Sequence, residues 1–203
     1  MNEMKTNLAA EEKFSAKKAA GFGFNYFSSI LNMLFISYLT FFATDSLYMS
    51  GAVVGMVLLL SKFMDGITDV IAGVLIDRTH SKWGKARPYV LMGILAWIAT
   101  VLMFCVPNFS ELGRAVYIFI FYNLNQSIFY TLSNVAKTVH LKRSIAKEEN
   151  RIKTLTISGM VYSIGSLVLN IAFPMLVAMI GGRQAGWIAM AAGLAVVSSI
   201  GIL

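Results

Sequence analysis

The chain has 203 residues, of which 57% are hydrophobic and only 13% are charged. A soluble domain usually carries about 45–50% apolar and about 25% charged residues, so this composition excludes an ordinary soluble enzyme. It also excludes a disordered chain, which requires low hydrophobicity and high charge. The single cysteine excludes an intramolecular disulfide. We therefore interpret the chain as an all-α integral membrane protein.

Six apolar stretches are long enough to cross a bilayer core, which requires about 20 helical residues. Transmembrane helices are predicted at 20–43, 51–76, 89–107, 115–139, 155–180 and 185–203, after a polar segment at 1–19. Turn-forming and charged residues separate the stretches. The alternating polarity of an outer-membrane strand is absent from them. The sequence therefore predicts one bundle of six transmembrane helices over 20–203.

The net charge is +7, and the basic residues are distributed unevenly over the two sides of the predicted topology. Fourteen of the seventeen Lys and Arg residues lie in the amino-terminal segment, the second connection or the fourth connection, and two lie on the opposite side. Because cytoplasmic loops carry the excess of basic residues, we predict a multi-pass protein of the plasma (inner) membrane with both termini in the cytoplasm. The positive charge thus reflects insertion into the lipid bilayer and does not indicate a nucleic-acid partner.

Three charged residues lie inside a predicted span, namely Lys62, Asp65 and Asp69. Their spacing places them within about 60° of arc on one helical face. Because a charge that faces lipid costs a few kcal/mol, they are expected to face a partner or a water-filled cavity. Two carboxylates one turn apart repel each other, and a monovalent cation, a shared proton or the Lys62 ammonium would relieve this repulsion.

Oxygen ligands suit a hard cation such as Na⁺, and the hydroxyls of Thr68 and Thr131 are candidates to complete its shell. The alternative is a buried structural ion pair between Lys62 and one aspartate. Intramembrane ionisable residues more often mark ion or proton pathways, which favours the cation site.

The connection after the second span is dense in cations. It reads Asp77-Arg78-Thr79-His80-Ser81-Lys82-Trp83-Gly84-Lys85-Ala86-Arg87-Pro88. One interpretation is a positive-inside anchor with its tryptophan at the membrane interface. The other is a latch, in which Asp77 and Arg78 pair with groups of a neighbouring bundle and hold one conformation.

Together these residues resemble the major facilitator superfamily and, more narrowly, its melibiose-permease-like glycoside–pentoside–hexuronide:cation symporters. The match is carried by Asp65-Gly66-Ile67-Thr68-Asp69, Gly73, Asp77 and the segment from Ser81 to Pro88. Weaker support comes from Lys18, Gly21-Phe22-Gly23, Tyr130-Thr131 and Glu149-Asn150-Arg151. The resemblance covers the chain from Lys18 onward but only the amino-terminal half of the family's length. It implies the amino-terminal six-helix bundle of a major facilitator fold.

The resemblance also implies site residues. A coupling-cation site for Na⁺ or H⁺, with no transition metal or other cofactor, would consist of Asp65, Asp69, Thr68 and Thr131. The solute would lie between the first, fourth and fifth spans. The candidate solute-binding residues are Asn25, Ser28, Asn32, Lys62, Tyr130 and Asn134. The candidate gating residues are Asp77, Arg78, Trp83, Gly84, Lys85 and Arg87.

The sequence departs from the galactoside pattern of the family at three positions. Acids expected on the first and fourth spans are replaced by Ser28 and Asn134, and an expected arginine is replaced by Ser158. These losses argue against recognition of α-galactosides. Amide groups still donate to and accept from sugar hydroxyls, so a glycoside, a pentoside or another polar solute is expected. Alternatively, several of the amides only bond between helices.

The sequence thus predicts half of a cation-coupled secondary transporter, not an enzyme. The chain ends at Leu203 within an apolar run, which favours a truncated or split symporter, or a homodimer of two such halves. The alternative function is a non-transporting membrane module or accessory subunit that pairs with a second six-helix half. Within the carrier class, transport of an amphipathic lipid is a further alternative.

Overall fold

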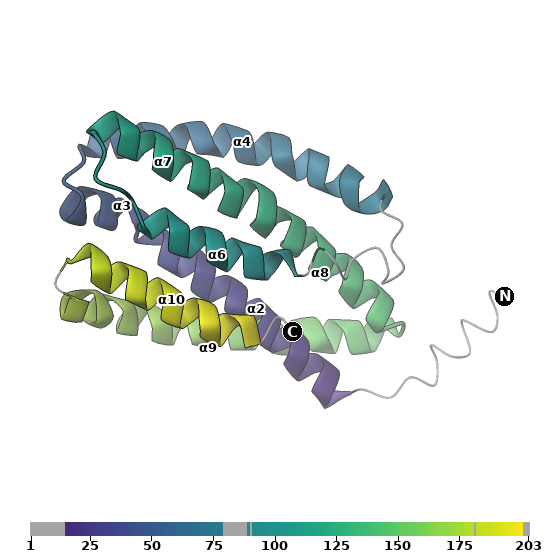
Figure 1. Ribbon diagram of the computed structural model, residues 1–203. Coiled ribbons are helices and arrows are strands. Elements are labelled where there is room, and N and C mark those ends of the chain that lie inside the picture. The colour runs from purple at the N-terminus through teal and green to yellow at the C-terminus, as the bar shows by residue number, and fades with distance from the viewer. Residues whose placement is uncertain (1–14, 79–88, 90, 181, 201–203) are drawn as a thin grey trace.

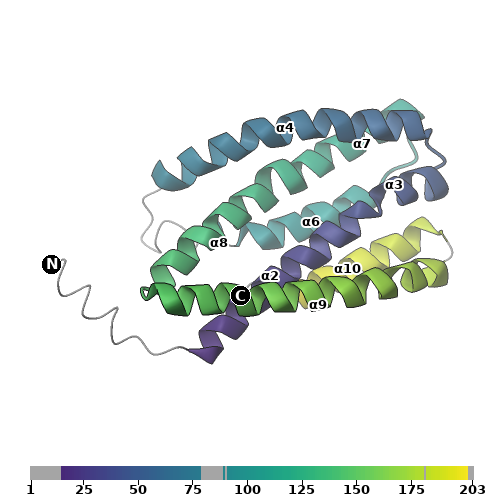
Figure 2. The same ribbon diagram turned by 180° about the vertical axis from the view of Figure 1, so that it is seen from behind.

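The computed structural model describes residues 15–78, 89, 91–180 and 182–200. Helical elements that lie side by side make up this part of the chain (Figures 1 and 2). The prediction of an all-α bundle of six helical rods is confirmed. Within these described residues, three helices are long and apolar enough to cross a membrane, namely Ala19–Ser46, Gly51–Leu75 and Glu148–Met179.

The six rods follow one another along the chain, and two of them contain a π-helical turn. The first three rods are α2 (Ala16–Ser37) with α3 (Leu39–Phe41) and η1 (Phe42–Ser46), then α4 (Gly51–Arg78), then α6 (Met92–Phe104). The fourth rod joins α7 (Glu111–Asn123), η2 (Leu124–Tyr130) and α8 (Thr131–Ser144), and the last two are α9 (Glu148–Ile180) and α10 (Gln184–Ile200).

The third rod is shorter than expected, and the fourth is longer. Helix α6 covers only 13 residues of the predicted span at 89–107, and Cys105 leaves the helical conformation two residues before Pro107. A proline disfavours helix in the residue before it, so the end of α6 has a local cause. In the fourth rod, Ser110 caps α7 and accepts a hydrogen bond from the Gly113 amide. The last turn of α8 carries Lys142 and Arg143, whose positive charges interact favourably with the helix dipole at its carboxyl end.

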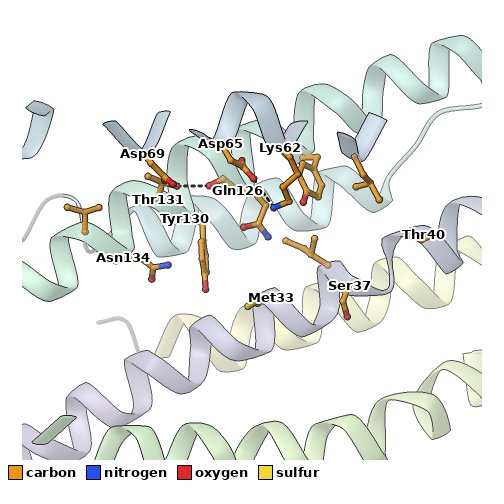
Figure 3. A pocket seen from close by; sticks show the side chains of 14 residues that line it. Met33, Ser37, Thr40, Lys62, Asp65, Asp69, Gln126, Tyr130, Thr131 and Asn134 are labelled. Carbon is orange, nitrogen blue, oxygen red and sulfur yellow. Dashed lines mark hydrogen bonds and ion pairs between the residues drawn. The ribbon is translucent and has the colours of Figure 1, made fainter. Parts of the chain in front are cut away.

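The rods are arranged so that α4 and α9 lie at opposite edges of the bundle (Figures 1 and 2). Helix α9 packs against α2, α10 packs against α6, and α4 packs against α7 and α8. The first and fourth rods therefore separate α4 from α9. The pocket described below lies on the α4 side of α2 (Figure 3).

An aromatic core joins the first, third and sixth rods at one end of the bundle. Trp187 of α10 is fully buried and stacks on Phe104 of α6 with ring centroids 5.7 Å apart. Phe35 and Phe42 of the first rod each lie 4.6 Å from the Phe104 ring, measured between centroids. The Trp187 indole nitrogen donates to the Ser46 hydroxyl at 3.0 Å, so its polar group is satisfied. This core fixes the positions of the rods at that end.

A buried polar cluster joins the first, third and fourth rods. Thr100 of α6 is fully buried, and its hydroxyl accepts from the side-chain amides of Asn32 at 2.7 Å and Asn125 at 2.5 Å. The same Asn125 amide donates to the Ala96 carbonyl at 2.6 Å, and the Thr100 hydroxyl donates to that carbonyl at 2.9 Å. Such bonds replace the water that an apolar bundle excludes.

Replacement of Thr100 by valine keeps the shape of this side chain but leaves the Asn32 amide without its hydrogen-bond partner. We expect Thr100→Val to destabilise the bundle by about 1–3 kcal/mol. Thr138→Val is the matched control, because the Thr138 hydroxyl is exposed and bonds only to its own helix. The measurement is thermal unfolding in detergent, and equal shifts in Tm for the two variants would contradict the prediction.

Candidate functional site

A pocket of about 510 Å³ lies between the first rod, α4 and the fourth rod (Figure 3). Ligand pockets in proteins usually have volumes of about 300–1,000 Å³, so its size suits a small organic solute. Its lining combines charged, amide, hydroxyl and aromatic side chains with the apolar side chains of Met33, Ile36, Leu58 and Val135. The lining residues are Met33, Ile36, Ser37, Thr40, Leu58, Lys62, Asp65, Asp69, Tyr122, Gln126, Tyr130, Thr131, Asn134 and Val135.

Helix α4 presents Lys62, Asp65 and Asp69 to this pocket, as their helical spacing predicts (Figure 3). The Lys62 ammonium lies 2.9 Å from Asp65 Oδ2. The Asp65 side chain is 20% exposed and that of Lys62 is 67% exposed, so the lysine approaches from the open side. The described lining residues therefore carry one formal positive and two formal negative charges.

Among the described residues, three side-chain hydrogen bonds link α4 to the fourth rod, and each joins residues that are 62 positions apart. The Asn123 amide donates to the Ser61 hydroxyl at 3.0 Å, Ser127 donates to Asp65 Oδ1 at 2.5 Å, and Thr131 donates to Asp69 Oδ1 at 3.0 Å. We call these three pairs the polar ladder. A constant offset means that the two helices run parallel in matched register. Steps of four residues follow one ridge on each helix surface.

Both hydroxyls that reach the aspartates have a second acceptor. Ser127 Oγ lies 3.1 Å from Asn123 Oδ1, and Thr131 Oγ1 lies 3.1 Å from the carbonyl oxygen of Gln126. A hydroxyl has one hydrogen to donate and two lone pairs to accept with. Each hydroxyl therefore has an alternative place for its hydrogen when its aspartate binds something else.

Ser127 was not predicted as a site residue, although it is buried and lies nearer to a carboxylate than Thr131 does. It belongs to the π-helix η2, and π-helical turns are frequent at functional sites. The sequence does carry a signal for it, because residues 123, 127 and 131 are polar at intervals of four. That row mirrors the row at 61, 65 and 69 on α4.

The structure places the predicted cation ligand Thr68 away from this set. Its hydroxyl donates to the backbone carbonyls of Met64 at 2.9 Å and Asp65 at 3.0 Å, within its own helix. Thr68 does not belong to the described lining of the pocket. Of the four predicted cation ligands, the structure therefore brings together Asp65, Asp69 and Thr131.

The predicted solute-binding residues fall into two groups. Lys62, Tyr130 and Asn134 line the pocket, and Tyr130 and Asn134 lie on the side of the fourth rod that faces α2 (Figure 3). Gln126, in the same rod, joins them.

The other three predicted residues, all on α2, are buried outside the described lining. Asn32 bonds to Thr100, and the Ser28 hydroxyl accepts from the Trp97 indole at 3.3 Å. Asn25 is buried, and its side-chain oxygen has no hydrogen-bond partner among the described residues. Helix α9 contributes no residue to the described lining, whereas the sequence predicted that the fifth span would flank the solute.

The predicted gating motif is described only in part. Asp77 and Arg78 are the last two residues of α4. Trp83, Gly84, Lys85 and Arg87 lie outside the described residues. The choice between an anchor and a latch therefore stays a prediction.

Comparison with known proteins gives a family match. The family model described as MFS/sugar transport protein matches residues 21–203. The chain is 31% identical over 183 residues to YnaJ, an uncharacterized symporter of Bacillus subtilis (strain 168), which covers 87% of the chain and 39% of that protein. It is 32% identical over 170 residues to an isoprimeverose transporter of Lactiplantibacillus pentosus, with 81% and 35% covered.

A third relative is YicJ, an inner membrane symporter of Escherichia coli (strain K12). It is 36% identical over 126 residues, which are 61% of the chain and 27% of that protein. The chain thus spans less than two fifths of the length of each of these three relatives.

The contact between Ser127 and Asp65 is expected to appear as an energetic coupling. In a double-mutant cycle of Ser127→Ala and Asp65→Asn we expect a coupling of about 1 kcal/mol, since bonds to charged groups are strong but interhelical bonds in membranes are modest. The control cycle pairs Ser127→Ala with Asp69→Asn, which the polar ladder does not join. Unfolding free energies in detergent provide the values. Equal coupling in both cycles would show that the ladder register is wrong.

Proposed function

We propose, from the premise that the chain belongs to the MFS/sugar transport protein family, that it is the cation- and solute-binding bundle of a secondary transporter. Family membership confirms the resemblance inferred from the motif of α4 and the connection after it. It also confirms that the chain is an integral, multi-pass membrane protein of a transporter family and not an enzyme. The site residues, the coupling ion and the solute are the subject of the proposal.

The observation that carries the proposal is the meeting of Asp65 and Asp69 with the hydroxyl of Thr131 at one pocket. Carboxylate and hydroxyl oxygens are ligands that hard cations prefer. The described lining has a formal charge of −1, from two aspartates and one lysine, and one monovalent cation neutralises it. We therefore propose that Na⁺ or H⁺ binds at Asp65 and Asp69, with Thr131 as a further ligand for Na⁺.

The solute is proposed to bind beside the cation, between the first and fourth rods. Gln126 and Asn134 offer amide donors and acceptors for hydroxyl groups, and Tyr130 offers a ring and a hydroxyl. Similarity to an isoprimeverose transporter supports a sugar- or glycoside-like solute. Because the cation removes the excess negative charge of the shared pocket, each ligand favours the binding of the other.

A second six-helix half is proposed to complete the transporter, either as a separate segment or as a second copy of this chain. The chain spans 39% of YnaJ and 35% of the isoprimeverose transporter. In the membrane-length helices α4 and α9, only 17% and 11% of the most apolar 18-residue stretch is buried inside the bundle. Rocking of two such halves about a shared site is the general mechanism of this class of carrier.

The cation site is tested by three variants of the purified chain in lipid nanodiscs. We expect Asp69→Asn to reduce Na⁺ affinity by at least about tenfold, because it removes a charged ligand. Thr131→Val is expected to reduce it by a few fold, because it removes a neutral ligand. Thr68→Val is the matched control and should leave it unchanged, since this hydroxyl bonds to its own helix. Binding is measured with radioactive Na⁺ at constant ionic strength.

Unchanged Na⁺ affinity in Asp69→Asn would overturn the proposed site. If neither Na⁺ nor a change in pH altered solute binding or thermal stability, the non-transporting accessory module would be the better assignment. An equal loss in Thr68→Val and Thr131→Val would contradict the placement of the two hydroxyls.

The proposed orientation has both termini in the cytoplasm, and it predicts the labelling of introduced cysteines. In a Cys105→Ser background, a membrane-impermeant maleimide should label Asn108→Cys on intact cells. It should label Glu148→Cys only after permeabilisation, because the fourth connection is rich in basic residues. Both native side chains are exposed, so access to them depends on the side of the membrane. The reverse pattern would invert the topology.

A further inference from the structure

The two aspartates of the pocket differ in what already occupies them. Both oxygens of Asp65 are engaged, Oδ2 by the Lys62 ammonium at 2.9 Å and Oδ1 by the Ser127 hydroxyl at 2.5 Å. Asp69 receives the Thr131 hydroxyl on Oδ1 at 3.0 Å. No ion pair within the described part of the chain includes Asp69. The ammonium therefore occupies an oxygen of Asp65 that a cation bound at this carboxylate would contact.

The lysine is held loosely enough to leave this position. Its side chain is 67% exposed, and it approaches Asp65 from three residues earlier on the same helix. Exposed ion pairs of this kind contribute little, because solvent screens them and the long side chain loses freedom on pairing. Tyr122 lies close to the ammonium and also lines the pocket. Lys62 therefore has an alternative contact when it releases Asp65.

We propose that Lys62 is a tethered occupant of the cation site, and that the coupling cation displaces its ammonium from Asp65 into the solute pocket. This inference rests on the proposed function and adds a specific exchange to it. One cation enters and the ammonium stays within the pocket, so the formal charge of the described lining changes from −1 to neutral. The released ammonium offers three hydrogen-bond donors to oxygen atoms of a solute.

The exchange explains why the solute and the cation would bind together. Without the cation, the ammonium is paired and the pocket lacks its strongest donor. With the cation, the donor is free beside Gln126, in a pocket that Asn134 also lines at its other end (Figure 3). Solute oxygens that accept from the ammonium prevent its return to Asp65 and so retain the cation, as linkage requires.

The displacement is tested by the chemical reactivity of Lys62 in the wild-type chain in nanodiscs. We expect saturating Na⁺, compared with choline at equal ionic strength, to raise acetylation of Lys62 by at least about threefold. The reason is that the lysine side chain released from Asp65 becomes the major population. Peptide mass spectrometry measures the modification at each lysine. Lys153 is the internal control, because it forms an exposed ion pair with Glu149 at 2.7 Å that does not belong to the pocket.

Two substitutions separate displacement from a general effect of charge. Lys62→Gln removes the competitor, and we expect Na⁺ to bind about twofold to fivefold more tightly, the range of a screened ion pair. Lys62→Arg keeps a competing cation and should bind Na⁺ about as the wild type does. Retained affinity in Lys62→Arg also shows that the site tolerates a change at this position.

The outcomes distinguish this inference from the function on which it rests. If Na⁺ binds and depends on Asp69 but Lys62 acetylation stays unchanged, the displacement is wrong and the cation site stands. Tighter binding in Lys62→Gln without a change in wild-type acetylation would mean that Lys62 acts through its field while still paired, which also overturns the displacement. If the wild type binds no Na⁺, both the sodium site and the displacement fail.

Discussion

The hydroxyl of Thr100 fixes the distance between the two walls of the pocket. It accepts from Asn32 of the first rod and from Asn125 of the fourth, and all three side chains are almost completely buried. The first rod forms one wall of the pocket, and the fourth rod both forms another and supports α4. Amides on the pocket-forming helices are thus divided between two roles. Asn32 and Asn125 hold the first and fourth rods to the third. Gln126 and Asn134, also in the fourth rod, line the pocket instead.

Helix α4 depends on the fourth rod in a different way. Its outer surface is mostly exposed, and its inner surface meets the fourth rod through the polar ladder as well as through small apolar contacts such as those around Ala72 and Ala136. Interhelical hydrogen bonds in membranes contribute modestly, on average about 0.6 kcal/mol each. The contacts that hold the proposed cation ligands are therefore also contacts that exchange at low cost. A site built in this way suits a ligand that must bind and leave in each transport cycle.

Sequence reasoning predicted the features that follow from the geometry of one helix more completely than those that depend on the packing of two. The apolar lengths predicted the rods, and the spacing of Lys62, Asp65 and Asp69 predicted their common face, because both follow from helical geometry alone. Ser127 was missed because the polar row at 123, 127 and 131 does not by itself set the register between α4 and the fourth rod, on which its contact with Asp65 depends. Thr68 could have been predicted differently from local chemistry, since a threonine within a helix commonly bonds to a carbonyl four residues earlier, as it does here to Met64.

The second acceptors of Ser127 and Thr131 bear on how a cation would enter. A hydroxyl that donates to a carboxylate turns its hydrogen toward the position of an incoming cation, which is unfavourable. For Ser127 the amide oxygen of Asn123 accepts the hydrogen instead, and for Thr131 the carbonyl of Gln126 does so. Each rotation leaves an oxygen lone pair facing the aspartates and leaves no donor unsatisfied. In the π-helical turn η2 the Gln126 carbonyl accepts the backbone N–H of Thr131, which brings the Thr131 hydroxyl within reach of the second lone pair of the same oxygen. The irregular turn in the fourth rod thus gives the proposed site hydroxyls that serve as donors before the cation binds and as ligands afterwards.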